Sequence, residues 1–407
     1  MTRQRVVLLS HIGYDAYRHD DGSPFFPPDE FDITLLAQPR DLAQGTPEGV
    51  SRCVPVDMLP SGGLAVPLPP LVHDLAFDWV VATRERLLLP AARLREARGI
   101  GGMGTEHTLL LRDKAAMKRH FAAHGIRVPE FMEISEPLQA AELLDRFGRI
   151  VIKPVLGSSS MDVHIVRDRN ELMSLHRRGL PGPDRYEAEE FIPGRQFHID
   201  SVVRDGVPVA ASVSRYLDSH ESFPLDGQIR SHTLDDGPDL DLLLEFNRAV
   251  LGCIDWFGGA THLEVFLDDR GGPVFCELAG RPGGAGIETT FEYRHGVSLL
   301  LASVLPQIGR TVPVPDNGGQ ARMDQPATGW SMIYPPRLGR FRGFDARPRA
   351  DWLLRLAAPY RPGELVREPR QAKDAIAIAS VRGKDAQDVV GRLAEVRTET
   401  VVSITPD

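Results

Sequence analysis

The chain has 407 residues, more than one hydrophobic core usually serves, so about two to four packed domains are expected. Hydrophobic residues make up 42% and charged residues 25%, and no apolar run is long enough to cross a bilayer, so no membrane partner is expected. The net charge of -9 and the lack of a Lys/Arg block argue against nucleic acid as a partner. Three widely spaced cysteines predict neither a disulfide framework nor a metal site, which fits a reducing cytoplasm.

Lysine is rare in this chain. Only five of the 47 basic residues are lysines, namely Lys114, Lys118, Lys153, Lys373 and Lys384. Genome composition alone would produce such a bias, but a lysine still stands out against the chain's own use of basic residues.

The first hundred residues alternate short apolar runs with turn-rich segments, which is typical of an α/β domain. We expect four strands and then a helix, at residues 6–9, 33–37, 52–56, 79–82 and 85–97. Residues 99–104 contain four glycines and are expected to form a flexible connector. We therefore place a domain boundary at residue 104.

The region after this boundary contains two predicted helices and several strands. The first helix is capped by Asp113 and ends near His124, where Gly125 and Pro129 stop it, and the second spans residues 240–251. Strands are expected at residues 149–155, 163–166, 187–191, 196–203, 207–214, 261–267 and 273–278. The tail reads strand, helix, strand over residues 374–381, 385–396 and 398–404, which predicts a small closing lobe.

Two of these strands carry glutamates that we expect to face each other. The strands flank the turn-forming residues 268–272 and should form a hairpin. With the turn centred after Arg270, Glu264 lies opposite Glu277, and the side chains of facing residues are ~5 Å apart at Cβ. Two carboxylates would repel each other there, and a divalent cation between them removes that penalty, which suits magnesium bridging to phosphates. A different register would instead turn one glutamate to solvent.

Glu277 leads directly into a segment with an arginine and paired glycines. Arg281 offers a forked donor to a phosphate or a carboxylate, and Gly283 and Gly284 allow close backbone approach. The alternative is that Arg281 is an ordinary salt-bridge partner.

Lys153 ends a mostly apolar strand and is followed by a Gly/Ser loop. The loop residues Gly157, Ser158, Ser159 and Ser160 offer backbone N–H groups and hydroxyls to phosphate oxygens, and the ammonium adds a point charge beside them. Because this is not a Walker A sequence, an ordinary hairpin turn beside a solvated lysine is the alternative.

Residues 189–194 alternate acidic and apolar groups before a Pro-Gly pair. Glu189, Glu190, Phe191 and Ile192 would present backbone groups to an adenine edge, while Phe191 or Ile192 lines the ring. An edge strand that ends in Pro-Gly is the alternative.

Two single residues complete the set of candidates. Lys114 shares a helix face with Met117 and Phe121. His262 shares a strand face with Glu264 and could contact a substrate. A solvated lysine and a structural histidine are the respective alternatives.

Taken in chain order, these motifs resemble the ATP-grasp superfamily. They are Lys114, Ile152-Lys-Pro with Gly157-Ser-Ser-Ser, Glu189-Glu-Phe-Ile-Pro-Gly, His262-Leu-Glu and Glu277-Leu-Ala-Gly-Arg-Pro-Gly-Gly. The chain looks most like carboxylate-amine ligases of the L-amino acid ligase and carnosine synthase kind, over roughly residues 75–310. The resemblance implies an α/β and α+β architecture. It consists of an N-terminal Rossmann-like (pre-ATP-grasp) domain at 1–104, an ATP-grasp domain at 105–320 with a lid at about 130–190, and a C-terminal α+β lobe at 321–407.

The resemblance also implies roles for the candidate residues. Lys153 and Arg281 would take part in catalysis, with Arg281 gripping the carboxylate and the developing acyl phosphate. The implied sets are Lys114, Lys153, Gly157, Ser158, Ser159, Ser160, Glu189, Glu190, Phe191, Ile192 and Gln196 for ATP, Glu264 and Glu277 for Mg2+ (or Mn2+), and His262, Arg281, Gly283 and Gly284 for substrates.

Two positions depart from the family pattern. The family often has an asparagine two residues after its second metal-binding glutamate, where this chain has Ala279, so that water would replace a ligand. An acidic contact to ribose would fall on Gln196, which can still bond a hydroxyl but carries no charge.

The expected function is that of an ADP-forming ligase, which activates a carboxylate as an acyl phosphate and joins it to an amine, with an amino acid as the expected substrate. Two alternatives stay open: an ATP-grasp enzyme that uses another nucleophile or bicarbonate, and a nucleotide-binding protein without turnover. The expected partners are small-molecule carboxylates and amines, and a homodimer is common among similar proteins.

One charged segment has no assigned role. Residues 215–234 form either a substrate-recognition loop or a charged surface loop. The segment contains Arg215, His220, Glu221, Arg230 and His232.

Overall fold

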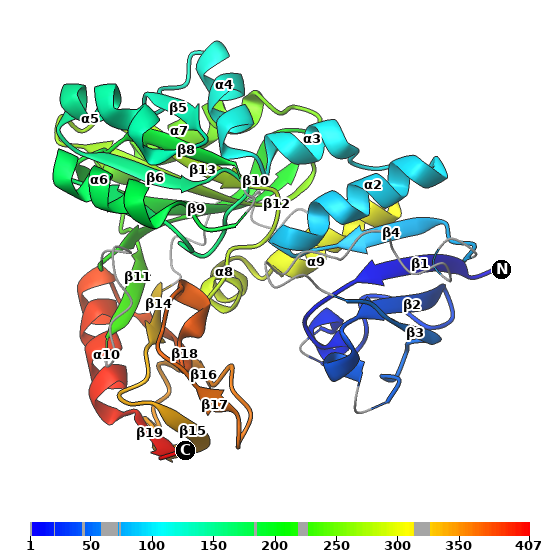
Figure 1. Cartoon of the computed structure of the whole chain (residues 1–407). Coiled ribbons are helices and arrows are strands. Elements are labelled where there is room, and N and C mark those ends of the chain that lie inside the picture. The colour runs from blue at the N-terminus through cyan, green and yellow to red at the C-terminus, as the bar shows by residue number, and fades with distance from the viewer. Residues whose placement is uncertain are drawn as a thin grey trace.

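The computed structural model describes residues 2–19, 21–42, 45–57, 72, 75–182, 185–218, 227–312 and 326–407. These residues form three lobes: an N-terminal lobe at the right of Figure 1, an upper lobe, and a C-terminal lobe at the lower left. Among the helices of these residues, none has the length and apolar character that a membrane crossing requires.

The N-terminal lobe contains a parallel four-stranded sheet with the order β3-β2-β1-β4. Its strands are β1 (Gln4–Leu9), β2 (Phe31–Ala37), β3 (Arg52–Pro55) and β4 (Trp79–Ala82). Apolar side chains point to both faces, as is typical of parallel strands that are covered on both sides. Helix α2 (Leu88–Arg98) packs on one face, and α9 (Leu299–Val304), from much later in the chain, packs on the other.

The region predicted as a lid contains an antiparallel sheet in the upper lobe, with the order β5-β8-β6-β7. Its elements are β5 (Phe131–Ile134), α5 (Ala141–Phe147), β6 (Ile150–Pro154), β7 (His164–Val166), α6 (Arg169–Arg178) and β8 (Tyr186–Glu190). The two helices pack on the sheet through one apolar cluster, which includes Leu143, Ile150 and Leu172. The region predicted as a lid therefore has an apolar core of its own.

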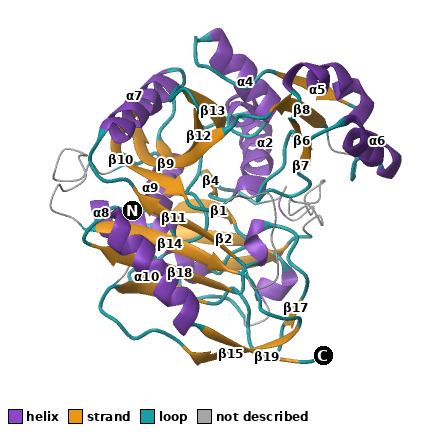
Figure 2. Ribbon diagram, turned by 90° about the vertical axis from the view of Figure 1, so that its left-hand side faces the viewer, coloured by secondary structure: helices purple, strands orange, loops and turns teal. Residues whose placement is uncertain are grey.

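An eight-stranded antiparallel sheet runs from the upper lobe into the C-terminal lobe, with the order β13-β12-β9-β10-β11-β14-β18-β16 (Figure 2). Its strands are β9 (Gly194–Arg204), β10 (Val207–Tyr216), β11 (Gln228–Thr233), β12 (Gly259–Asp268), β13 (Pro273–Ala279), β14 (Ala327–Ile333), β16 (Leu353–Ala357) and β18 (Ala377–Gly383). Helices α4 (Lys114–Ala123) and α7 (Pro238–Gly252) pack on one face of its upper half, and α8 (Ile287–His295) packs in a separate cluster with β11 and β14.

The C-terminal lobe adds one helix and a small sheet to the end of the large sheet. Helix α10 (Ala386–Glu399) packs against β14 and β18. The small sheet has the order β17-β15-β19, from β15 (Gly339–Ala346), β17 (Leu365–Val366) and β19 (Val401–Thr405). Helix α3 (Thr105–Leu110) follows the glycine-rich connector between the N-terminal and upper lobes.

The predicted strands and helices are present, with small differences in their limits. Asp205 and Gly206 both have positive φ, at 50° and 71°, which confirms the tight hairpin turn between β9 and β10. At the tail, α10 continues to Glu399, so the last strand begins at Val401 and not at residue 398. The domain limits at residues 104 and 320 stay predictions.

Candidate active site

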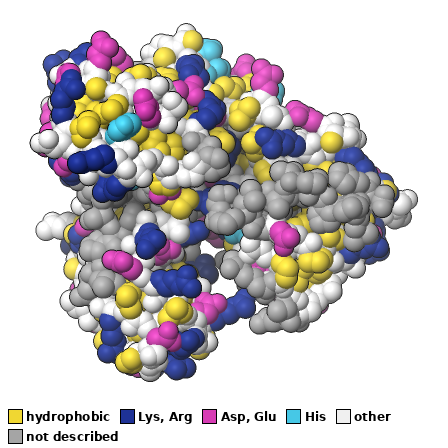
Figure 3. Space-filling model, viewed as in Figure 1, with side chains coloured by type: hydrophobic (Ala, Val, Ile, Leu, Met, Phe, Trp, Pro, Cys, Tyr) yellow, Lys and Arg dark blue, Asp and Glu magenta, His cyan; other side chains and the backbone are white. Residues whose placement is uncertain are grey.

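A cavity of about 1420 Å³ lies where the three lobes meet. Figure 3 shows a hollow between the lobes with Lys and Arg side chains near its rim. The cavity is lined by Lys114, Lys153, Gly157, Ser158, Ser159, Ser160, Glu189, Glu190, Phe191, Ile192, Gln196, His262, Glu264, Glu277, Arg281 and Gly284 from the predicted set. Gly283 is the one predicted residue outside this lining. The structure therefore gathers residues that are widely separated in the sequence around one space.

The two predicted metal ligands face each other on adjacent strands. Glu264 on β12 pairs in register with Glu277 on β13, and a β-bulge places Cys276 as an extra residue beside them. Lys114 Nζ lies 2.7 Å from Glu277 Oε2, and Gln196 Nε2 donates to Glu264 Oε2 at 3.1 Å. Burial alone would raise the pKa of Glu277, but the Lys114 ammonium brings it below its ordinary value. Two carboxylates at the cavity wall fit a divalent cation with oxygen ligands.

A buried quartet of two lysines and two glutamates lies behind the cavity wall. Lys153 Nζ is 2.5 Å from Glu189 Oε1, and Lys118 Nζ is 2.5 Å from Glu187 Oε1. Lys118 also forms an ion pair with Glu189. Burial alone would raise the pKa of Glu189, but the two lysines lower it, whereas burial keeps the pKa of Glu187 raised. Two cations compensate two anions, and the quartet ties α4 to lid strands β6 and β8.

Lys118 and Glu187 were not among the site residues predicted from the sequence. The available signal was the rarity of lysine together with the spacing of Lys118 from Lys114, because residues at i and i+4 share one helix face. The quartet also affects Glu189: its carboxylate is engaged by lysines, so the predicted contact of this segment with adenine depends on backbone groups and apolar side chains.

Replacing Lys118 by methionine is expected to destabilise the protein and to weaken ATP binding. The change leaves two buried carboxylates with one lysine, which costs about 3–5 kcal/mol in comparable cases, and it draws Lys153 away from the cavity. Urea unfolding and the KM for ATP measure the two effects. The double variant Lys118→Met/Glu187→Gln removes one charge of each sign and should recover most of the stability. Equal stability of the single and double variants would contradict this account.

The lid's Gly/Ser loop contacts both of the other lobes. Arg86 Nε donates to Ser158 Oγ at 3.2 Å, and the Ala372 backbone N–H donates to the Ser159 carbonyl at 3.2 Å. Ser159 and Ser160 have φ of 60° and 54°, which is uncommon for residues other than glycine. The loop is thus held across the cavity in a strained backbone conformation.

The predicted adenine segment presents one apolar side to the cavity. The Arg149 guanidinium lies 3.6 Å from the centroid of the Phe191 ring, and Ile192 is buried. The Glu190 backbone N–H donates to the Glu130 carbonyl, so this part of the segment is anchored to the chain before β5.

Arg281 is held by a glutamate from the N-terminal lobe, which the sequence did not reveal. Glu85 forms ion pairs with both Arg281 and Arg112, and Arg281 Nη1 also donates to the Pro282 carbonyl at 2.6 Å. Burial would raise the pKa of Glu85, but the guanidiniums of Arg112 and Arg281 bring it below its ordinary value. Arg281 is therefore fixed in orientation and charged.

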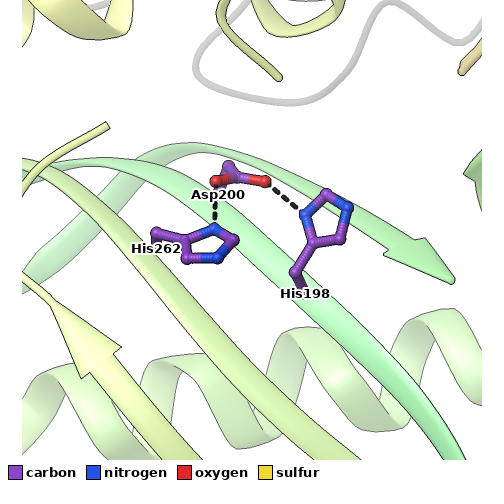
Figure 4. Close-up of side chains that lie close together, drawn as sticks. All are labelled: His198, Asp200 and His262. Carbon is purple, nitrogen blue, oxygen red and sulfur yellow. Dashed lines mark hydrogen bonds and ion pairs between the residues drawn. The ribbon is translucent and has the colours of Figure 1, made fainter. Parts of the chain in front are cut away.

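A second polar cluster, which the sequence also did not reveal, supports His262 (Figure 4). His262 Nδ1 and His198 Nδ1 lie 2.8 Å and 2.6 Å from the two oxygens of Asp200, and His198 Nε2 lies 2.8 Å from Ser231 Oγ. Burial would lower the pKa of His262, but the Asp200 carboxylate raises it to about 10.

This cluster also explains why residue 283, which does not line the cavity, is a glycine. A Cβ atom on Gly283 would lie 2.8 Å from Asp200 Oδ1 and 2.9 Å from His262 Nδ1, so only glycine fits there. The three groups of the cluster could offer a metal ion one atom each. In this structure the two Nδ1 atoms are engaged in hydrogen bonds with Asp200, and His262 Nε2 lies 3.5 Å from Glu264 Oε1.

The charged segment at residues 215–234 is only partly described. His220 and Glu221 lie outside the described residues. Arg230 pairs with Asp218, and His232 is buried. Arg215 lies on β10 and lines the cavity, whereas Arg230 and His232 lie on β11, so these parts of the segment are strands and not a loop. A recognition role for the segment stays a prediction.

Comparisons with known proteins agree with this geometry. No protein-family profile matches the chain. The chain is 26% identical over 348 residues to the L-arginine-specific L-amino acid ligase of Bacillus subtilis, and the match covers 81% of each chain. Among solved structures, an L-amino acid ligase from Bacillus licheniformis superposes with a TM-score of 0.75 at 18% identity, over 100% of both chains.

A third similar protein carries ligands. The biotin carboxylase domain of the 2-oxoglutarate carboxylase of Hydrogenobacter thermophilus, crystallised with MgADP, ADP and bicarbonate, has a TM-score of 0.70 at 13% identity, over 99% of this chain and 92% of that one. The fold, the order of the motifs and the sequence relative agree. The chain therefore has the ATP-grasp fold of these structures, and over most of its length its sequence is similar to that of an L-amino acid ligase.

Proposed function

We propose that this ligase activates the carboxylate of an amino acid or small acid with ATP and couples it to the amine of a second substrate. One observation carries the proposal: Glu264 and Glu277 face each other in a cavity that Lys114, Lys153 and Arg281 also line. This arrangement supplies acidic metal ligands, cations for phosphates and a forked donor in one space.

The first half of the reaction transfers a phosphoryl group. A donor carboxylate oxygen attacks the γ-phosphorus of ATP and ADP leaves, which gives an acyl phosphate. Lys114 and Lys153 neutralise phosphate oxygens, and the closed lid excludes water. A magnesium ion held by Glu264 and Glu277 would offset the charge of both carboxylates and of the phosphates.

The second half forms the amide. The neutral amine attacks the acyl carbon, the bond from that carbon to the phosphate oxygen breaks, and the phosphate leaves with one oxygen of the donor carboxylate while the nitrogen loses one proton to the phosphate or to water. Arg281 donates hydrogen bonds to the oxyanion that develops on the former carbonyl oxygen. Because Glu85 fixes the guanidinium in advance, little reorganisation is needed in the transition state.

A phosphate-release screen of paired amino acids and small acids, with product masses read out, tests the proposal. We expect one ADP and one phosphate per amide, and loss of activity when EDTA removes divalent ions. Phosphate release that needs no amine would favour another nucleophile or bicarbonate, and release of AMP and pyrophosphate would contradict the scheme. A homodimer and a cytoplasmic location stay proposals.

A further inference from the structure

The two predicted metal ligands are held by different kinds of partner. Glu277 Oε2 lies 2.7 Å from the Lys114 ammonium, which the proposed function assigns to ATP. Glu264 receives a hydrogen bond from a neutral side chain on each of its oxygens. Gln196 Nε2 donates to Oε2 at 3.1 Å, and the Tyr216 hydroxyl donates to Oε1 at 3.3 Å. Outer-shell hydrogen bonds of this kind orient a carboxylate that ligates a metal ion.

Both donors are placed by the large sheet. Glu264 on β12 pairs with His198 on β9, and Gln196 lies two residues before His198 on the same face. Tyr216 is the last residue of β10. The centroid of its ring lies 4.9 Å from that of His198 and 6.0 Å from that of Trp330, and the ring meets Trp330 edge-on. Strand positions and ring packing therefore fix where the two donors lie.

Two other side chains near Glu264 make longer contacts. His262 Nε2 lies 3.5 Å from Oε1, and its ring is oriented by the hydrogen bond between Nδ1 and Asp200. Cys276 Sγ lies 4.0 Å from Oε2, and a thiol is a weak donor. The amide and the phenol hydroxyl are therefore better placed than these two groups to orient the carboxylate.

The residue type at position 196 suits this contact. A glutamine donates through its amide nitrogen, whereas a glutamate in the same place would have no proton to donate at neutral pH and would add a third carboxylate beside Glu264 and Glu277. Ala279, two residues after Glu277, has no side-chain oxygen to offer a cation. Binding of an ion to this hairpin therefore depends on two carboxylates, so the orientation of each has a large effect.

We propose that Gln196 and Tyr216 are positioning residues that hold the Glu264 carboxylate in the orientation in which it binds a divalent cation. This inference rests on the proposed function, because that function supplies the cation. Neither residue needs to contact the ion or the phosphates for this role. A carboxylate that is fixed in advance loses less rotational freedom when it binds an ion, so the ion binds more tightly.

Binding of ADP with and without Mg2+ tests this role. Isothermal titration calorimetry gives the Kd for ADP in excess Mg2+ and in EDTA, and the ratio of the two Kd values measures the coupling between ion and nucleotide. Tyr216→Phe keeps the ring and loses only the hydroxyl. We expect its Kd in EDTA to be unchanged and its Kd in Mg2+ to rise about 10-fold, as for loss of an outer-shell partner in other metal sites. Gln196→Met should change the ratio in the same direction by a similar factor.

Tyr186→Phe is the matched control. The Tyr186 hydroxyl, on β8, donates to the Pro181 carbonyl at 3.0 Å, and Tyr186 is outside the cavity lining. The substitution makes the same chemical change as Tyr216→Phe and should leave both Kd values at the wild-type level. Thermal unfolding without ligands shows whether each variant is folded.

The ratio of the two Kd values separates a positioning role from other roles. An equal rise of both Kd values in the two variants overturns the inference, because the side chains would then bind the nucleotide or support the fold without acting through the metal ligand. Wild-type values of both Kd in the two variants also overturn it. A wild-type enzyme whose affinity for ADP does not respond to Mg2+ contradicts the metal site of the proposed function itself, which is a distinguishable failure.

Discussion

Arg281→Met is expected to lower kcat for amide formation about 10²- to 10³-fold, as does removal of one oxyanion donor in other enzymes. The methionine fills a similar volume but donates no hydrogen bond to the developing oxyanion. Glu85 keeps Arg112 as a partner, so the protein should stay folded. Steady-state kinetics with saturating substrates measure the effect.

The conservative variant Arg281→Lys separates charge from geometry. A lysine retains the positive charge but lacks the planar fork that Glu85 orients, so we expect only partial recovery of kcat. Methionine and lysine variants with wild-type kcat would show that Arg281 is only the salt-bridge partner of Glu85.

Replacing either facing glutamate by glutamine is expected to reduce activity about 100-fold or more. A divalent cation at a phosphoryl-transfer site contributes several kcal/mol, and each ~1.4 kcal/mol corresponds to a tenfold change in rate. Glu264→Gln and Glu277→Gln should also raise the Mg2+ concentration needed for half-maximal activity. Titration of Mg2+ at fixed ATP measures both quantities.

The hairpin itself provides the matched control for this prediction. Asp269 lies in the exposed turn between β12 and β13, so Asp269→Asn makes the same chemical change outside the cavity and should leave activity unchanged. An unchanged Mg2+ requirement in both glutamine variants would exclude the two glutamates as metal ligands.

The hairpin was predictable from the sequence because its signals are local. Strand alternation and the turn at residues 268–272 predicted the hairpin, but the predicted turn centre after Arg270 was wrong, because Leu267 pairs with Pro273 and the turn is therefore centred on Arg270. Glu264 faces Glu277, as predicted, only because a bulge adds Cys276 to β13, and one extra residue in a strand leaves no distinct mark in a single sequence.

The other parts of the site depend on contacts between distant segments. Lys118 meets Glu187 only because the lid docks on α4, and Glu85 reaches Arg281 only because the N-terminal lobe packs on the upper one. His198 and Asp200 alternate on β9 and could be placed on one face, but pairing with His262 depends on β9 lying beside β12. The motifs could therefore be found from sequence patterns. The side chains that hold the motif residues in place could not, because they come from distant segments that meet only in the folded protein.

The oxygen atoms of the donor carboxylate give the most direct test of the central claim, which is that this cavity forms an acyl phosphate. With a donor labelled with 18O in both carboxylate oxygens, one labelled oxygen should appear in inorganic phosphate for each amide formed. Label in AMP, or phosphate that carries none while amide accumulates, would contradict the account.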